Sequence, residues 1–382
     1  MSNEGRSMRI GVIHHSLNST GGGERVCLSL IKALKNKGFD VVLATTEKTE
    51  WDVVEKRLGC RVDVEEVSFL PFRLRMFGIY QRLLTGFLTP ALKRSVDIII
   101  NTHGDMIFGF ADITYMHYPV IALKYEKPEV YVKYRQNIFW RSYFAPYEVM
   151  QKTLLKMFLK NSLILTNSKY SARAIRKYLR RNSFIIYPPV DVEFFRTNLD
   201  KKENNLVLSV GRYTPEKRYE LIPLIAKECK DAEFVVVGSV SLKAEPYYQK
   251  VKSLVEKYGC KNVKLLRNIP LEELKELYAR ASIYLHLMAG EHFGISVVEA
   301  MSAGCVPLVH RSGGPWLDIV DQGKYGFAYG NVKECCKKIN ELTKMDLSSM
   351  RKKIQKRSQD FSEEKFQEKI IKIIEEYLKL VS

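Results

Sequence analysis

The sequence predicts an α/β protein built from two halves, each a parallel sheet with helices on both faces. The first observation is that short apolar runs of strand length alternate with stretches of helical spacing, which is typical of parallel sheets. The second is that this alternation stops near residue 188 and begins again near residue 206. The third is the length: 382 residues are long for one core and suit two domains.

The first half is expected to begin with a strand at residues 8–14. A glycine run then leads into an apolar helix that ends at Lys37, followed by Gly38, a common residue at helix C-termini. Further strands are expected at residues 39–44, 97–101, 113–117, 163–166 and 183–187. Residues 188–191, with two prolines, and the polar residues 197–205 are interpreted as a linker.

The second half repeats the pattern, with strands expected at residues 206–210, 233–237, 263–266, 283–287 and 306–309. The last helix, residues 363–380, is amphipathic. Its apolar positions are Phe366, Ile370, Ile373, Ile374 and Tyr377. We therefore expect a first domain over residues 1–195, a second over 196–365, and a terminal helix over 366–382.

Residues 290–318, GEHFGISVVEAMSAGCVPLVHRSGGPWLD, are the most informative stretch of the chain. Glu291 and Glu299 are separated by seven residues, and a loop between them enters a helix near Ile295. Backbone N–H groups at a helix start favour a diphosphate, and carboxylates accept hydrogen bonds from sugar hydroxyls. The pattern therefore predicts a pocket for a nucleotide-sugar, whereas a lone glutamate is more often a surface residue.

Two other loops follow the first strand of each half. The run Gly21–Gly23 permits close approach of a phosphate or sugar, although a glycine run is often only a turn. In residues 211–217, Arg212 and Lys217 are placed to neutralise the two phosphates of a leaving nucleoside diphosphate, the alternative being a solvated loop.

These motifs resemble those of the family 4 retaining glycosyltransferases, which have the GT-B fold. The resemblance rests on EHFGISVVEAMSAG followed by SGGPWLDIV, on GGGER at residues 21–25 and on YMHYP at residues 115–119, and it spans residues 8 to about 330. The sequence of these motifs is most similar to that of mannosyltransferases that extend a lipid-linked oligosaccharide of N-glycosylation from GDP-mannose. The resemblance implies two Rossmann-like domains, ligands in the cleft between them, and a terminal helix that crosses back to the first.

The resemblance also implies roles for individual residues. His117 and Glu291 are expected to be catalytic, with Glu291 facing the transferred sugar, although His117 has the alternative of a satisfied core histidine. The donor-binding set is Gly22, Gly23, Arg212, Lys217, His292, Phe293, Gly294, Ile295 and Glu299, with Glu299 on the ribose. His14 and His15 are interpreted as structural or pocket-lining, and His103 as a residue of the acceptor side. No Asp-x-Asp motif is present, so transfer without a metal or any cofactor besides the donor is expected.

The net charge of +18 is unevenly distributed, because residues 68–182 contain 19 Lys and Arg but 6 Asp and Glu. Two segments here, residues 69–80 and 131–144, mix aromatic and basic residues as membrane-interface segments do. A core-facing helix or an ordinary solvated surface is the alternative. The expected acceptor and membrane residues are Arg73, Arg75, Phe77, Lys133, Arg135, Trp140 and Arg141, with Phe72 and Phe139 also inserted.

The remaining composition bears on location. No apolar run reaches the roughly 18 residues of a membrane span, and residues 1–7 lack the pattern of a signal peptide. The seven cysteines contain no CxxC pair, which favours a reducing cytosol. A peripheral protein on the cytosolic face of a membrane is expected.

The expected reaction is transfer of mannose, with retention, from GDP-mannose to a polyprenyl-diphosphate-linked glycan. A UDP-sugar donor with another lipid or polysaccharide acceptor stays open. A nucleic-acid-binding protein is suggested by the charge alone. That reading leaves Glu291, Glu299 and the glycine loops unexplained, and no nucleic-acid partner is expected.

Overall fold

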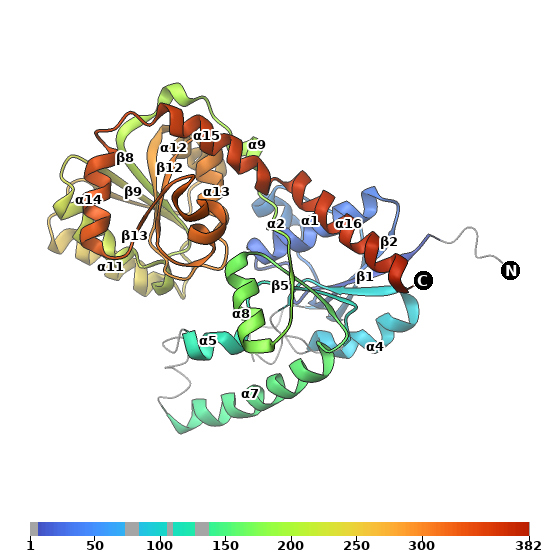
Figure 1. Cartoon of the computed structure of the whole chain (residues 1–382). Coiled ribbons are helices and arrows are strands. Elements are labelled where there is room, and N and C mark those ends of the chain that lie inside the picture. Colours follow the sequence, from blue (N-terminus) through green and yellow to red (C-terminus); the bar gives the residue numbers. More distant parts are fainter. Residues whose placement is uncertain (1–6, 73–83, 105–109, 127–136, 382) are drawn as a thin grey trace. The chain divides into compact units, whose positions relative to one another are not determined.

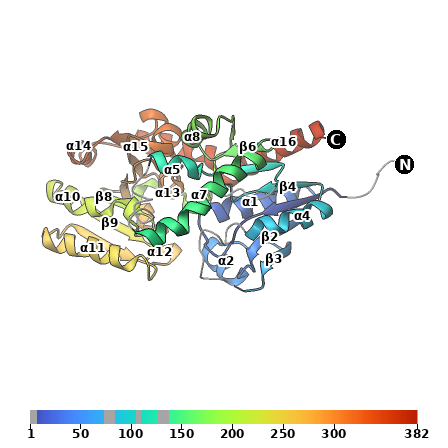
Figure 2. The same cartoon turned by 90° about the horizontal axis from the view of Figure 1, so that it is seen from below.

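The computed structural model describes residues 7–72, 84–104, 110–126 and 137–381. It divides the chain into two compact units (Figures 1 and 2). The first unit comprises residues 1–189 and 366–382, and the second comprises residues 190–365. The division falls between Pro189 and Val190, inside the proline-containing stretch and before the boundary expected at residue 195.

The first unit contains a parallel sheet whose described strands follow the order β3-β2-β1-β4-β5-β6-β7. The strands are β1 (Arg9–Ile13), β2 (Asp40–Glu47), β3 (Glu65–Leu70), β4 (Ile98–Asn101), β5 (Ile113–Met116), β6 (Leu163–Thr166) and β7 (Phe184–Ile185). The helices are α1 (Gly22–Asn36), α2 (Trp51–Leu58), α4 (Thr85–Ser95), α5 (Val120–Glu126), α7 (Ile138–Phe158), α8 (Lys169–Leu179) and α16 (Glu363–Val381).

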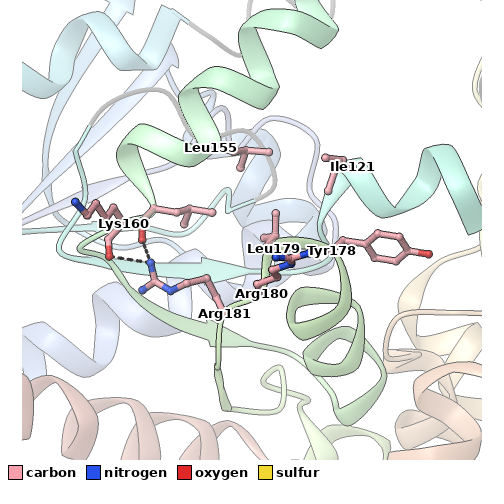
Figure 3. A pocket seen from close by; sticks show the side chains of 8 residues that line it. Ile121, Leu155, Lys160, Tyr178, Leu179, Arg180 and Arg181 are labelled. Atoms are coloured by element: carbon pink, nitrogen blue, oxygen red, sulfur yellow. Dashed lines mark hydrogen bonds between the residues drawn. The ribbon is translucent and has the colours of Figure 1, made fainter.

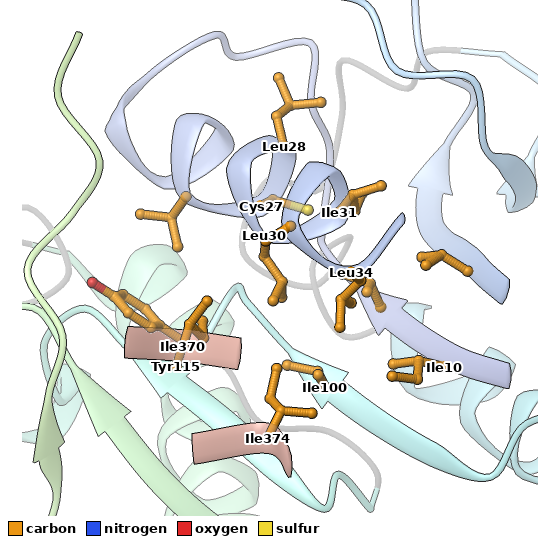
Figure 4. Close-up of a cluster of buried hydrophobic side chains, with 14 of the residues drawn as sticks. Ile10, Cys27, Leu28, Leu30, Ile31, Leu34, Ile100, Tyr115, Ile370 and Ile374 are labelled. Atoms are coloured by element: carbon orange, nitrogen blue, oxygen red, sulfur yellow. The ribbon is translucent and has the colours of Figure 1, made fainter. Parts of the chain in front are cut away.

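The core of the first unit explains why α16 belongs to it. The buried positions of α1 include Cys27, Leu30, Ile31 and Leu34, spaced three or four residues apart on one face. Ile370 and Ile374 of α16 join the same cluster, together with buried residues of β1, β4 and β5. Figure 4 shows these two isoleucines beside the side chains of α1 and Ile100. The apolar stripe predicted for the last helix is thus buried in the first unit.

The second unit also contains a parallel sheet, with its described strands in the order β10-β9-β8-β11-β12-β13. The strands are β8 (Glu203–Val210), β9 (Glu233–Gly238), β10 (Val263–Arg267), β11 (Ala281–His286), β12 (Val306–His310) and β13 (Phe327–Tyr329). The helices are α9 (Val192–Phe195), α10 (Ile222–Glu228), α11 (Glu245–Lys257), α12 (Leu271–Arg280), α13 (Ile295–Ser302), α14 (Val332–Leu342) and α15 (Ser348–Ser358). Short helical turns include η4 (Pro215–Lys217).

The order of the strands reverses once in each sheet. In the first sheet the reversal lies between β1 and β4, and in the second between β8 and β11. Ligands of open α/β sheets bind beyond the carboxyl ends of the strands at such a reversal. Ligand-binding residues are therefore expected in the loops after β1 and β4 in the first unit, and in the loops after β8 and β11 in the second.

The predicted α/β class, with two parallel sheets and interleaved helices, is confirmed. Two edge strands, β3 and β13, were not predicted. The linker prediction was wrong at its end, because β8 begins at Glu203 rather than at residue 206. Within the described part of the chain, no helix is both long enough and apolar enough to cross a membrane.

Candidate active site

An ion pair lies at the strand reversal of the second sheet. Lys217 ends η4 after β8, and Glu291 follows β11. Lys217 Nζ donates a hydrogen bond to Glu291 Oε2, and the two side chains are only 17% and 16% exposed. His286, the last residue of β11, places its Nε2 3.7 Å from the same oxygen. Two side chains selected from sequence are thus in direct contact.

The electrostatics of this cluster favour a charged Glu291. Burial alone would raise the pKa of the Glu291 carboxyl, but the positive charge of Lys217, followed by His286, lowers it well below its usual range. Burial and then the charge of Lys217 lower the pKa of His286 to about 3. Near neutral pH Glu291 is therefore a carboxylate and His286 a neutral imidazole.

Two glycine loops hold the backbone around Glu291. Gly294 precedes α13 with a φ of 101°, a left-handed conformation that favours glycine. A Cβ atom on Gly313 would lie 2.4 Å from the Glu291 carbonyl oxygen, and one on Gly314 would lie 2.3 Å from that of His292. Gly314 N also donates to the Glu291 carbonyl at 2.8 Å. The loop after β12 therefore packs on the backbone of the loop after β11, which only glycine permits.

Glu299 lies inside α13 and is 8% exposed. The Tyr278 hydroxyl donates to Glu299 Oε2 at 3.1 Å. The neighbouring Tyr284 hydroxyl donates to Ser296 Oγ at 2.7 Å, one turn earlier on the same helix. Both tyrosines are buried, Tyr278 on α12 and Tyr284 on β11, so their hydrogen bonds fix the face of α13 that carries Glu299.

The other residues predicted to bind the donor in the second unit differ in how far they are exposed. Arg212 is exposed and forms no ion pair with any described residue. Phe293 is buried and packs edge-on against Phe361, with ring centroids 5.7 Å apart. Its side chain is therefore part of the core, and only its backbone is available to a ligand. Ile295 begins α13, whose first turn presents backbone N–H groups without intrahelical partners.

A second polar cluster lies at the strand reversal of the first sheet. His14 Nδ1 lies 2.9 Å from Thr102 Oγ1, and the Thr102 hydroxyl donates to the Ile13 carbonyl at 3.1 Å. His14 Nδ1 therefore carries the proton of the first contact. On its other side, His14 Nε2 faces Glu24 at 3.9 Å. Burial would lower the pKa of His14, but Cys27 and Glu24 raise it above its ordinary value.

His117 and the glycine run belong to the same cluster. His117 Nε2 donates to the Thr102 carbonyl at 3.1 Å, which leaves Nδ1 as an acceptor. A Cβ atom on Gly23 would lie 3.3 Å from His117 Nε2, so the glycine run passes directly beside the ring. Burial, followed by repulsion from His14, lowers the pKa of His117 to about 4. Near neutral pH His117 is an uncharged imidazole.

Sequence reasoning missed several members of these clusters. Glu24 accepts a hydrogen bond from Gly21 N at 2.8 Å and faces His14, and its place just after the glycine run was the available signal. His286 ends a strand that had been predicted, so strand-end position was again a usable signal. Thr102 directly follows a predicted strand, so the same signal applied to it. Tyr278 carried no signal, because it acts through a contact with Glu299, which is 21 positions away in the sequence.

Part of the predicted acceptor and membrane set lies outside the described residues, namely Arg73, Arg75, Phe77, Lys133 and Arg135. Of those described, Trp140 and Arg141 lie in the first turn of α7, which is capped by Asn137 accepting from Trp140 N at 2.9 Å. Phe139 and Phe72 are 67% and 58% exposed. Arg141 is also exposed, whereas Trp140 is half-buried.

Comparison with known families defines the class of protein. Residues 20–194 match the family described as Glycosyltransferase Family 4, and residues 191–361 match Glycosyl transferases group 1. The two matches meet at the junction between the units and together span most of the chain. The chain belongs to these glycosyltransferases and has their GT-B fold, as the resemblance implied.

Relatives narrow the similarity further. The chain is 26% identical to "GDP-Man:Man(3)GlcNAc(2)-PP-Dol alpha-1,2-mannosyltransferase" of Dictyostelium discoideum, over 96% of the chain and 84% of the relative. It is 27% identical to the Homo sapiens protein of the same name, over 97% of the chain and 87% of the relative. The chain is therefore an enzyme similar over nearly its whole length to these mannosyltransferases.

Solved structures bear out the fold. Anabaena HepE in complex with UDP and glucose matches with a TM-score of 0.71 at 18% identity, covering 97% of the chain and 100% of that structure. Sucrose-phosphate synthase from Thermosynechococcus elongatus matches with a TM-score of 0.74 at 17% identity, covering 98% of the chain and 100% of that structure.

Proposed function

We propose that this glycosyltransferase transfers mannose, with retention, from GDP-mannose to a polyprenyl-diphosphate-linked glycan at the cytosolic face of a membrane. The donor and acceptor classes are those in the names of its relatives. The observation that supports the proposal most is the contact of Lys217 with Glu291 at the strand reversal of the second sheet. A cation and a carboxylate side by side suit a ligand with a diphosphate next to a sugar.

The two side chains have unused bonding capacity for such a ligand. An ammonium group carries three N–H donors, and the hydrogen bond from Lys217 to Glu291 uses one of them. The contacts of Glu291 with Lys217 and His286 both fall on Oε2, so Oε1 is free of described partners. We assign the remaining Lys217 donors and Arg212 to the diphosphate, and Glu291 Oε1 to the sugar hydroxyls.

The rest of the donor site follows from the same logic. The N–H groups of Gly294 and Ile295 at the start of α13 are assigned to phosphate oxygens, and Glu299 to the ribose, with His292 and the Phe293 backbone alongside. The anionic Glu291 also stabilises positive charge that develops at the anomeric carbon as the sugar–phosphate bond breaks. In a same-face substitution the departing diphosphate accepts the proton of the acceptor hydroxyl, and no metal takes part.

In the first unit, Gly22 and Gly23 are assigned to close backbone approach of the donor. Neutral His117 offers Nδ1 as a hydrogen-bond acceptor for a sugar hydroxyl. His14 and Glu24 act as positioning residues, because Thr102 links His14 to His117 through its side chain and its carbonyl.

The membrane association is also a proposal, and exposed aromatic residues support it. Phe69 and Phe87 are 41% and 61% exposed with ring centroids 6.0 Å apart, and Phe110 is 57% exposed with Lys93 Nζ 5.4 Å above its ring. Exposed rings beside cations are typical of surfaces that enter a lipid interface. These residues extend the set that was predicted from sequence.

A panel of nucleotide-sugars tests the donor. Each is added to the full chain, with and without EDTA, and thermal unfolding is followed. GDP-mannose at 100 times its dissociation constant should stabilise the protein by about 2.7 kcal/mol, with or without EDTA. Stronger protection by UDP-sugars would replace the mannose assignment with the UDP-sugar alternative. Protection lost with EDTA and restored by Mg²⁺ would overturn metal independence.

A further inference from the structure

A cavity of about 610 Å³ lies in the first unit, away from the strand reversal. Its lining comes from three helices and the residues that end two of them: Ile121 of α5, Leu155 of α7, Tyr178 and Leu179 of α8, with Leu159, Lys160, Arg180 and Arg181. In Figure 3 the aliphatic side chains of Ile121, Leu155 and Leu179 surround one space. This volume lies within the range of roughly 300–1,000 Å³ that is usual for ligand pockets.

The aliphatic wall is part of the folded core. Leu155 and Leu159 are 7% and 3% exposed and form a buried cluster with Met116, Ile164 and Ile175. Met116 and Ile164 belong to β5 and β6, so the sheet supports the wall from behind. A wall held in this way keeps an apolar surface that suits a hydrocarbon chain.

The polar edge of the cavity is cationic. Arg181 is committed to structure, since its guanidinium donates to the carbonyls of Leu159, Lys160 and Ser162 beyond the end of α7. Lys160 and Arg180 are exposed, and neither forms an ion pair with a described residue. Arg180 has a φ of 53° as the C-cap of α8, which fixes its backbone beside the cavity. No acidic residue is among the described lining residues, so the edge favours an anion.

A hydrogen-bonded link connects the cavity with the segment of His117. Tyr178 of the lining donates to Glu126 Oε1 at 3.0 Å, and Tyr118 donates to the other oxygen of the same carboxylate. Tyr118 follows His117 directly, and Ser171 Oγ of α8 donates to the His117 carbonyl at 2.8 Å. The helices that line the cavity therefore also hold the segment that carries a proposed site residue.

We propose that this cavity binds the first isoprene units of a polyprenyl diphosphate, with Lys160 and Arg180 on the diphosphate. The commitment to a lipid with an anionic head rests on the aliphatic wall together with two cations that no described residue pairs. That this lipid is the carrier of the acceptor glycan rests on the proposed function. The chemistry of the cavity alone defines only an isoprenoid-sized apolar chain with a phosphate at one end.

The test is calorimetric titration of the full chain with farnesyl diphosphate, with farnesol and inorganic pyrophosphate as the two separate parts. Farnesyl diphosphate should bind at least tenfold more tightly than either part, because it uses the wall and the cations at once. Combining Lys160→Gln with Arg180→Gly removes both charges without straining residue 180, and should weaken binding on the order of tenfold at low salt. Arg176→Gln, on an exposed position of α8, is the matched control and should change nothing.

A second pair of variants tests the wall. Leu179→Trp and Ile121→Trp each add volume from a partly exposed position, so the fold is retained while the cavity fills, and each should abolish the binding of farnesyl diphosphate. Equal affinity in the wild type and both tryptophan variants, or equal affinity for farnesyl diphosphate and pyrophosphate, would overturn the proposal. So would no binding at all.

The donor panel separates this proposal from the proposed function. Protection by GDP-mannose without any binding of farnesyl diphosphate would overturn the cavity assignment alone. Binding of farnesyl diphosphate that depends on Lys160 and Arg180, without protection by any nucleotide-sugar, would support the cavity and overturn the transferase donor assignment.

Discussion

The Lys217 ammonium is bonded to the Glu291 carboxylate, joining loops 74 positions apart in the chain. The two loops follow β8 and β11, the neighbouring strands between which the order of the second sheet reverses. The pair thus lies where a ligand of an open α/β sheet is expected. Both side chains are largely buried, so removing one leaves the polar group of the other buried without its partner. The pair can therefore be tested by mutation.

Lys217→Ala and Arg212→Ala should separate stability from binding. Lys217→Ala removes the partner of a largely buried carboxylate, and should lower the free energy of unfolding by about 1–3 kcal/mol and GDP affinity at least tenfold. Arg212→Ala should weaken GDP while sparing stability, because Arg212 is exposed. Calorimetry with GDP and urea unfolding measure the two effects, with Lys227→Ala, at an exposed position of α10, as control. Unchanged GDP affinity in both variants would remove the diphosphate assignment.

How far sequence reasoning reached can be judged from particular elements. Leu163–Thr166 was predicted at its observed bounds, because a strand with neighbours on both sides in a parallel sheet is a mainly apolar run. The strands missed were at the edges: β3 has half-exposed and exposed residues in alternation, and β13 has three residues. Short or half-polar edge strands carry little apolar signal.

For the site, spacing along the chain indicated Glu291, Glu299 and Lys217 but not that Lys217 contacts Glu291. His14 was interpreted as structural or pocket-lining. Its contact with Glu24 joins the end of β1 to the start of α1, whereas its contact with Thr102 depends on β4 becoming the neighbour of β1. Such contacts are fixed by sheet order, which a local pattern does not specify. The roles of the predicted residues in catalysis and binding stay predictions.

Gly313→Ala should disturb the fold around Glu291 more than an equivalent change elsewhere. Both Gly313 and Gly259 have a positive φ, 78° and 62°, so alanine at either costs about 1–2 kcal/mol of backbone strain. At Gly313 the new Cβ also lies 2.4 Å from the Glu291 carbonyl oxygen, whereas at Gly259 nothing lies within 4 Å. Urea unfolding should show a further loss of about 2 kcal/mol for Gly313→Ala. Equal losses in the two variants would contradict the packing.

His286 should make stability depend on pH below neutrality. Burial, followed by the charge of Lys217, lowers its pKa to about 3 in the folded state, against about 6.5 in an unfolded chain. Between these values the unfolded state binds more protons, so the free energy of unfolding falls as pH falls, by at most about 1.4 kcal/mol per pH unit. His286→Gln lacks this contribution. In urea unfolding from pH 7 to pH 5, the free energy of unfolding should therefore change less steeply with pH for the variant than for the wild type. The same pH dependence in both proteins would contradict a buried neutral histidine.

Charge reversal tests the membrane surface. Changing Lys133, Arg135 and Arg141 to Glu should release the protein from anionic liposomes at low salt, because each basic residue near such a surface contributes about 1 kcal/mol. GDP binding should persist, since the proposed diphosphate ligands are in the second unit. Reversing the exposed Lys250, Lys257 and Lys261 gives a control of equal net charge. Co-sedimentation with liposomes measures the binding. If neither the reversal of Lys133, Arg135 and Arg141 nor high salt reduces it, the basic segment is an ordinary solvated surface.

The most direct test of the account is transfer of radiolabelled mannose from GDP-mannose to a polyprenyl-diphosphate-linked glycan, by the wild type and by Glu291→Gln and Glu299→Gln. The wild type should give an α-linked product. Glu291→Gln should lower turnover more than it weakens GDP, because its carboxylate acts on the sugar, and Glu299→Gln should mainly weaken GDP. Absence of transfer from GDP-mannose by the wild type, or full turnover by Glu291→Gln, would contradict the account.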